Sequence, residues 1–583
     1  LNTGTLGRIE VLRGPSSALY GNSSGGIISI KSDIISDKKY QIRSEMNAGS
    51  FGFSRYGVGV SGEFINGAAG IDFYTTNYDG FRNHSNAKFS GINFITSQPF
   101  HERFGLTIIA NYYNSPYLLN PGSLNKYDAE TNPEKARESI INSGAGKKVE
   151  QFQTGISFKY DFSNSSKLNT TLYAINRSLL NSIPSRIIDL QRFAYGMRST
   201  FSWSPNILNN NINLIAGFDY EVQDDSRTEF ENMGIWEESS KEADEVLNNL
   251  GYGDKLLDQE EMVNAIGVFS QLEYLPSENI KLSAGLRYDN FKFEAKDKFY
   301  KDSADNSGSR IMSSFSPTIG VGIKIFDIAT LYGNYSTAFQ TPTTNELGNT
   351  PDGSGGFNNS LNAENIRSVE TGLRGYLNSI GFNYNIALYY MNIGDMLIPY
   401  QSALEETFYR NSGETDNKGI EVSLGWNPYK YAVVEFAYTY QDMKFKDFVV
   451  ERNSVLYQLA GNYVPGIPKH YLNLGFRSQL LNDFFAQIEI KYVSKTYAND
   501  FNGPAPNESG RVEEFVNDEY TVINLKFNYL ADLNFGQLNI KAGIENLFNK
   551  RYNGSIVPNA FGNNFFEPAS NRALYAGIQL FIH

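Results

Sequence analysis

The chain has 583 residues, of which 14% are aromatic, and it contains 52 Gly; this balance favours strands over helices. It has no cysteine and only four scattered histidines, so we expect neither a disulfide framework nor a protein-built metal site, and no cofactor. The formal net charge is −13, and no basic clusters interleaved with aromatic residues occur, which excludes a nucleic-acid partner.

The opening segment is rich in glycine and reads RIEVLRGPSSALYGNSSGGIISI over residues 8–30. Gly14 and Pro15 predict a turn, and the glycines that follow permit positive φ or a close approach of two backbones. A phosphate-binding loop is not indicated, because its lysine and hydroxyl residue are missing at the required spacing. The pattern is typical of the end of a small domain, which we place at residues 1–36.

From residue 37 to residue 583 the sequence repeats segments of alternating apolar and polar residues, separated by turn signals. Ile523, Leu525 and Phe527 fall on one face of such a segment, while Asn524 and Lys526 fall on the other. This period of two predicts about 22 strands. Short connections alternate with long ones. The long connections are expected at roughly 113–150, 224–262, 340–366, 445–463, 498–515 and 549–568.

A soluble sandwich would alternate in the same way, but it gives no reason to sort connections by length. An outer-membrane barrel explains why short and long connections alternate, because its short turns lie on the periplasmic side and its long loops lie outside the cell. No apolar run is long enough for a membrane helix. We therefore predict an all-β fold, a 22-stranded antiparallel transmembrane β-barrel, whose lumen is too wide for side chains to fill.

Residues 224–261 hold 13 acidic and three basic residues, a local balance of −10. We expect a solvated external loop, in which residues 237–250 form a short helix. Binding of divalent cations among lipopolysaccharide phosphates is the alternative.

Five stretches of the chain together resemble one family, the TonB-dependent outer-membrane receptors, and residues 113–133 further resemble the third external loop of ferric-citrate and other siderophore receptors. The five stretches are the opening segment, residues 334–347 with 361–375, residues 410–426, residues 543–553 and the closing NRALYAGIQLFIH. The resemblance implies that residues 1–36 are the C-terminal remnant of a plug domain, most of which is lacking. Residues 37–583 would be the barrel.

In that family, plug arginines pair with barrel glutamates. By strand parity Glu370 and Glu421 face the lumen, and the resemblance implies that Arg13 lies near both. We include Glu10 in this expected latch between plug and barrel. The alternative is that each is a solvated lumen charge.

Residues near the external mouth are the candidate ligand contacts, because arginine offers a fork to carboxylate or catecholate oxygens and tyrosine a flat amphipathic face. The alternative for each is loop packing. The candidates are Arg82, His84, Tyr113, Tyr117, Gln340, Tyr400, Arg410 and Phe565. No catalytic residues and no metal ligands are expected.

The function implied is energy-coupled import of a ferric siderophore across the outer membrane of a Gram-negative bacterium. The expected partners are the iron chelate, a TonB-type energy-coupling complex, and outer-membrane lipids with lipopolysaccharide, and the protein is expected to be a monomer. Import of a vitamin, an oligosaccharide or another metal complex is the alternative, followed by a passive porin. An enzyme is not expected, because no nucleophile and base stand together near the mouth.

Overall fold

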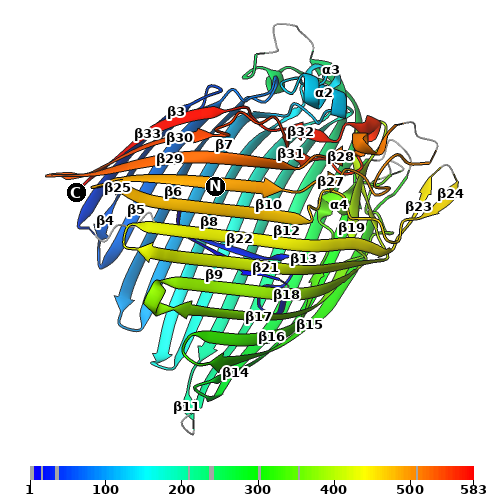
Figure 1. The fold of residues 1–583 in the computed structure, drawn as a ribbon. Coiled ribbons are helices and arrows are strands. Elements are labelled where there is room, and N and C mark those ends of the chain that lie inside the picture. Colours follow the sequence, from blue (N-terminus) through cyan, green and yellow to red (C-terminus); the bar gives the residue numbers. More distant parts are fainter. Residues whose placement is uncertain are drawn as a thin grey trace.

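The computed structural model describes residues 6–14, 17–32, 38–207, 210–235, 242–299, 304–351, 355–452, 454–506 and 510–583. Over these residues the chain forms one closed antiparallel barrel of 22 strands, drawn in Figure 1. The two-residue β11 (Asn206–Ile207) only extends the hairpin between β10 and β12. The barrel strands are β3 (Tyr40–Gly49), β4 (Ser54–Phe64), β5 (Gly67–Tyr78), β6 (Ala87–His101), β7 (Phe104–Leu119), β8 (Gly146–Ser163), β9 (Ser166–Ser182), β10 (Arg186–Trp203), β12 (Asn210–Ile235), β13 (Leu250–Ser277), β14 (Ile280–Asp297), β15 (Gly308–Ile325), β16 (Ala329–Gln340), β17 (Glu364–Leu377), β18 (Phe382–Gly394), β21 (Glu414–Tyr429), β22 (Ala432–Asp447), β25 (His470–Leu481), β26 (Phe484–Val493), β29 (Tyr520–Leu533), β30 (Gly536–Glu545) and β33 (Ala573–Ile582).

Each barrel strand pairs with the next one along the chain, and β33 pairs back with β3, with Ile42 opposite Ile582. Closure leaves the sheet without a free edge, so backbone groups facing lipid are paired. The prediction of a 22-stranded antiparallel barrel is therefore confirmed. No helix of the described residues is long and apolar enough to cross a membrane.

The wall has an apolar outer face and a polar inner face. Val369 and Ile578 are 53% and 54% exposed on the outside. Lys526, on the inner face, bonds Glu489 on the neighbouring strand through its Nζ at 2.7 Å. An exposed apolar band on a closed barrel is the surface that lipid covers.

The connections differ at the two ends of the barrel. Short turns, such as residues 65–66 and 482–483, lie at one end, which we call the short-turn end. The opposite, long-loop end carries the helices and the small hairpins. These elements are α2 (Lys126–Thr131), α3 (Glu138–Asn142), α4 (Thr344–Gly348), β19 (Leu397–Gln401), β20 (Thr407–Asn411), β23 (Val449–Arg452), β24 (Val455–Gln458), β27 (Thr496–Tyr497), β28 (Val516–Asn517), β31 (Asn553–Ile556) and β32 (Phe566–Pro568), with the 3₁₀ turns η3 (Val246–Asn248), η6 (Val512–Phe515) and η7 (Phe561–Asn563); the remaining one, η5 (Asn378–Ile380), is at the short-turn end.

Apolar cores lie where the ends of the barrel strands meet these long connections. One core packs Phe445 and Phe448 against Ile398, and a second packs Phe565 and Phe566 against neighbouring connections. These cores hold the loops in fixed positions over the barrel, because each buries side chains from several connections.

The prediction that residues 224–261 form a solvated loop is wrong. β12 continues to Ile235 and β13 begins at Leu250, so most of this acidic stretch is paired strand. Its acidity did not prevent pairing, because Asp225, Glu229 and Glu261 face inward and are buried. The predicted helix over 237–250 is also absent from the described part, where only a 3₁₀ turn occurs; residues 236–241 lie outside it. The 113–150 connection is likewise shorter than expected, since β7 reaches Leu119 and β8 begins at Gly146.

The opening segment forms a hairpin of β1 (Leu6–Arg13) and β2 (Gly26–Ser32), joined through α1 (Ser17–Tyr20). It lies inside the barrel, dark blue in Figure 1, with α1 packed against β13 to β16. Gly26 has φ +132°, and a Cβ there would lie 2.5 Å from the Leu12 carbonyl oxygen, so the hairpin requires glycine at this position. Pro15 lies outside the described residues.

Candidate functional site

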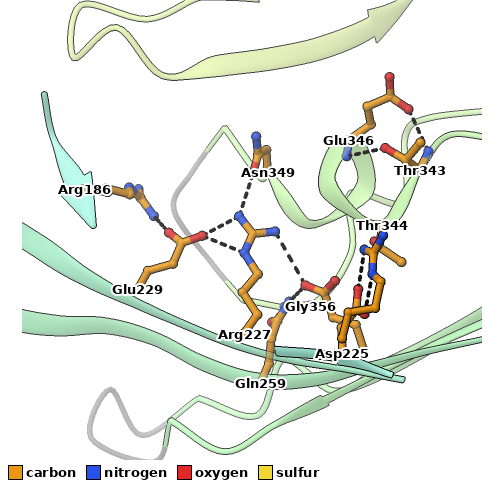
Figure 2. A network of polar contacts seen from close by, with 12 residues as sticks. Arg186, Asp225, Arg227, Glu229, Gln259, Thr343, Thr344, Glu346, Asn349 and Gly356 are labelled. Atoms are coloured by element: carbon orange, nitrogen blue, oxygen red, sulfur yellow. Dashed lines mark hydrogen bonds and ion pairs between the residues drawn. The ribbon is translucent and has the colours of Figure 1, made fainter. Parts of the chain in front are cut away.

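A buried network of charges lies where β10, β12 and β13 meet the connection between β16 and β17 (Figure 2). Arg227, 3% exposed, donates from Nε to Glu229 at 2.7 Å and from Nη2 to Asn349 at 2.8 Å. Its Nη1 lies 3.5 Å from Glu261, and Arg186 bonds the second oxygen of Glu229 at 2.7 Å. Every arginine and carboxylate in this network has an oppositely charged partner, which buried charges require. The network therefore fastens a loop to the wall, and we call it the wall clasp.

The connection of residues 395–413, which holds β19 and β20, is joined to three other parts of the long-loop end by ion pairs. The pairs are Arg137 with Glu405, Arg186 with Glu406 and Arg410 with Asp500, at 2.6, 2.6 and 2.9 Å. Burial raises the pKa of the Asp500 carboxyl, and Arg410 opposes this rise. A cavity of about 50 Å³ lies between this connection and the wall clasp, large enough for water but not for a chelate.

Three predicted ligand contacts are instead occupied in packing the loops. Arg82, 7% exposed, donates from Nη2 to the Lys135 carbonyl at 2.7 Å, and burial lowers its pKa to about 10. His84 bonds the Ala145 carbonyl through Nε2 at 2.9 Å, and burial lowers the pKa of its imidazole. Phe565 is 2% exposed inside a loop core. None of the three presents a free polar group or ring face to the lumen.

The other five predicted contacts lie on strands at or near the mouth. Tyr113 faces inward on β7, with its ring 6.2 Å from that of Phe89. Tyr117 packs against a loop core, and Gln340 accepts a hydrogen bond from Ser24 of the inner hairpin. Tyr400 lies beneath the Arg410 guanidinium at 4.8 Å. They do not converge on one point.

The expected latch residues are partly brought together. Arg13 Nη1 lies 2.9 Å from Glu421 Oε2. Glu370 accepts a hydrogen bond from Tyr332 at 2.9 Å, and its carboxylate borders Gly14. Glu10 does not face the wall; it bonds Arg8 at 2.7 Å and lies 3.8 Å from Lys31 within its own hairpin. The grouping of Glu10 with the barrel glutamates is therefore corrected, because Glu10 and Arg13 lie three residues apart and so point to opposite faces of β1.

A row of inward-facing polar residues across β7, β8, β9, β10 and β12 was missed in the sequence. The strand register places Tyr113 opposite Gln151, Gln151 opposite Arg177, Arg177 opposite Arg192, and Arg192 opposite Asp225. We call these five residues the arginine row. The segment TLYAINRSLLNS, residues 171–182, does not place Arg177 inward by its alternation, because Ile175 and Leu179 share its face. The sequence also does not give the register that sets two arginines side by side.

Among the described residues, no group of three or more His, Asp and Glu side chains is arranged to hold a metal ion. The inner wall instead presents paired charges, tyrosines and arginines. Such a wall can bind a polar or anionic solute by hydrogen bonds and charge.

Fold and wall together define a large β-barrel transporter of the outer-membrane type. A family model described as "TonB dependent receptor-like, beta-barrel" matches residues 77–547. The chain belongs to this family, the TonB-dependent receptors.

Solved structures share the fold at low sequence identity. The siderophore receptor PiuA from Acinetobacter baumannii is 16% identical with a TM-score of 0.79, over 99% of this chain and 86% of PiuA. The ferric citrate transporter FecA in its unliganded form is 16% identical with a TM-score of 0.80, over 100% of this chain and 84% of FecA. The copper transporter OprC is 14% identical with a TM-score of 0.76, over 100% of this chain and 86% of OprC.

Proposed function

We propose that this protein imports a ferric siderophore across the outer membrane of a Gram-negative bacterium by energy-coupled transport. The observation that carries the proposal is the hairpin inside the barrel. Arg13 bonds Glu421 on one side of the wall, and Arg198 donates to the Leu19 carbonyl at 2.7 Å on another. A segment fastened to the inner wall would obstruct a passive pore, whereas an active importer needs a part that can be moved.

In this proposal residues 1–36 are the C-terminal part of the plug, and residues 37–583 are the barrel. Arg13, Glu370 and Glu421 hold the plug until a TonB-type complex pulls on it from the periplasm. The apolar outer face contacts membrane lipid and, near the loops, lipopolysaccharide. The protein acts as a monomer and carries out no bond chemistry.

The family membership and the likeness to siderophore and ferric citrate receptors favour an iron chelate as the substrate. The iron arrives already bound by its chelator, so the barrel recognises the organic shell through side chains such as Tyr113 and Arg410. The similar fold of a copper transporter makes another metal complex the second candidate.

Uptake of radioactive iron tests the proposal. Cells that carry the gene and cells that lack it are given single ferric siderophores, with and without a protonophore. We expect one ferric siderophore to enter only with the gene present and the membrane energised. Equal iron uptake by both strains, together with gene-dependent uptake of a copper complex, vitamin or sugar, would reject iron as the cargo. Uptake that persists with the protonophore would reject energy coupling.

A further inference from the structure

Arg177 is an inward-facing cation for which the described residues provide no ion pair. Its Nε is shielded from solvent and makes no hydrogen bond, and the rest of its guanidinium has no ion pair within the described residues. Its charged or titratable neighbours are Arg192, Asp225 and Tyr113. Of these only Asp225 is acidic, and it is already engaged by another arginine.

That arginine is Arg192, which holds Asp225 through two hydrogen bonds, from Nε at 2.8 Å and from Nη2 at 2.7 Å. Asp225 is fully buried in this pair. The Nη1 of Arg192 has no partner in the described part of the chain. The single carboxylate therefore contacts Arg192 directly and only neighbours Arg177, which has no ion pair among the described residues.

Arg177 and Arg192 also lie directly opposite each other on neighbouring strands. Like charges in this cross-strand position destabilise a sheet. The cost falls if an anion lies between the two guanidinium groups, because each can then donate to it with a charge-assisted hydrogen bond. Gln151 and Tyr113 continue the same row and add a polar group and a ring beside the arginines.

The row also lies along a route into the barrel. On β10, Arg192 is three inward-facing positions closer to the long-loop end than Arg198, the residue that holds the inner hairpin at Leu19. Along the strand, the row therefore lies between the long loops and the inner hairpin.

We propose that the arginine row is an anion-binding site, in which Arg177 and Arg192 hold the anionic oxygens of the transported iron chelate against Tyr113. The inference rests on the proposed function and narrows it to chelates that present carboxylate or catecholate oxygens. Arg177 acts as the specificity-determining residue, since within the described residues it holds no carboxylate of its own.

Calorimetric titration of the purified protein in detergent tests the site. The probes are ferric citrate, a ferric tris-catecholate, an uncharged ferric tris-hydroxamate and metal-free citrate. The variants are Arg177→Gln and Arg177→Lys, and the matched control is Arg477→Gln, which removes an inward-facing arginine on β25 far from the row. Heat-modifiable migration on gels verifies that each variant is folded.

We expect Arg177→Gln to raise the Kd of the anionic probes about 10- to 100-fold, the range for a lost hydrogen bond to a charged group. Arg177→Lys should recover only part of this, because lysine lacks the planar fork. The uncharged probe and the control should change less than about twofold.

If Arg177→Gln and Arg477→Gln bind the anionic probes alike, the inference is overturned. If wild-type protein binds no ferric probe, yet binds metal-free citrate in a manner that depends on Arg177, the iron proposal fails and the anion site stands. If no probe depends on Arg177, the site is rejected whatever the fate of the iron proposal.

Discussion

Removing Arg227 should release the wall clasp. The change to methionine keeps the volume but deletes two hydrogen bonds to Glu229, one to Asn349 and the ion pair with Glu261. Glu229 keeps Arg186 as a partner, whereas Glu261 keeps only the hydrogen bond from Gln259 at 2.7 Å.

A buried charge left without its partner costs about 3–5 kcal/mol. Only Glu261 loses its sole cation. We therefore expect Arg227→Met to lower the free energy of unfolding by about 3 kcal/mol, the lower end of this range. Adding Glu261→Gln to this variant removes the one charge left unpaired, so the double variant should regain most of that stability.

Urea unfolding in detergent, followed by tryptophan fluorescence, measures both free energies of unfolding. Hydrogen exchange of residues 341–351 reports whether the loop that holds Asn349 has been released. The reasoning is refuted if Arg227→Met unfolds at the urea concentration of the wild type, or if the double variant is less stable than the single one.

Three further predictions concern the loops and the latch. Phe445→Ala should lower the free energy of unfolding by about 3–5 kcal/mol, because a fully buried ring leaves a cavity in a loop core; an unchanged urea midpoint would contradict this. Burial depresses the pKa of His84 although its hydrogen bond to Ala145 favours the charged ring, so the packing of the loops around His84 should be fully stable above pH about 6.5 and lose stability as the pH falls below that value, where the unfolded state binds the extra proton. Hydrogen exchange of the 120–145 connection would show this, and His84→Gln, which cannot titrate, should remove the pH dependence. Glu370→Gln combined with Glu421→Gln should loosen the inner hairpin and raise the permeability of cells to a large hydrophilic antibiotic, whereas equal permeability in the double variant and a Glu435→Gln control would count against a latch.

Much of the barrel wall could be predicted from the sequence, because the alternation of apolar and polar residues is visible within each strand. The alternation of Ile523, Leu525 and Phe527 with Asn524 and Lys526 reports which face meets lipid, whatever the neighbouring strands are. The same parity placed Glu370 and Glu421 inside. The loops could not be predicted as well, because their ends depend on pairing; the acidic run after Asp224 was expected to be a loop, yet most of it is strand.

Alternation along the strands, together with the sorting of short and long connections, predicted from the sequence a barrel with an apolar outer face, since side chains point to opposite faces of any strand. Tertiary structure alone decided which inward residues meet. Closure of 22 strands fixes the register of each pair, and that register sets Arg177 beside Arg192 and joins Arg227 to Asn349 of a distant loop. Contacts between residues far apart in sequence depend on this register and on how the loops pack. The alternation within a single strand gives no information about either.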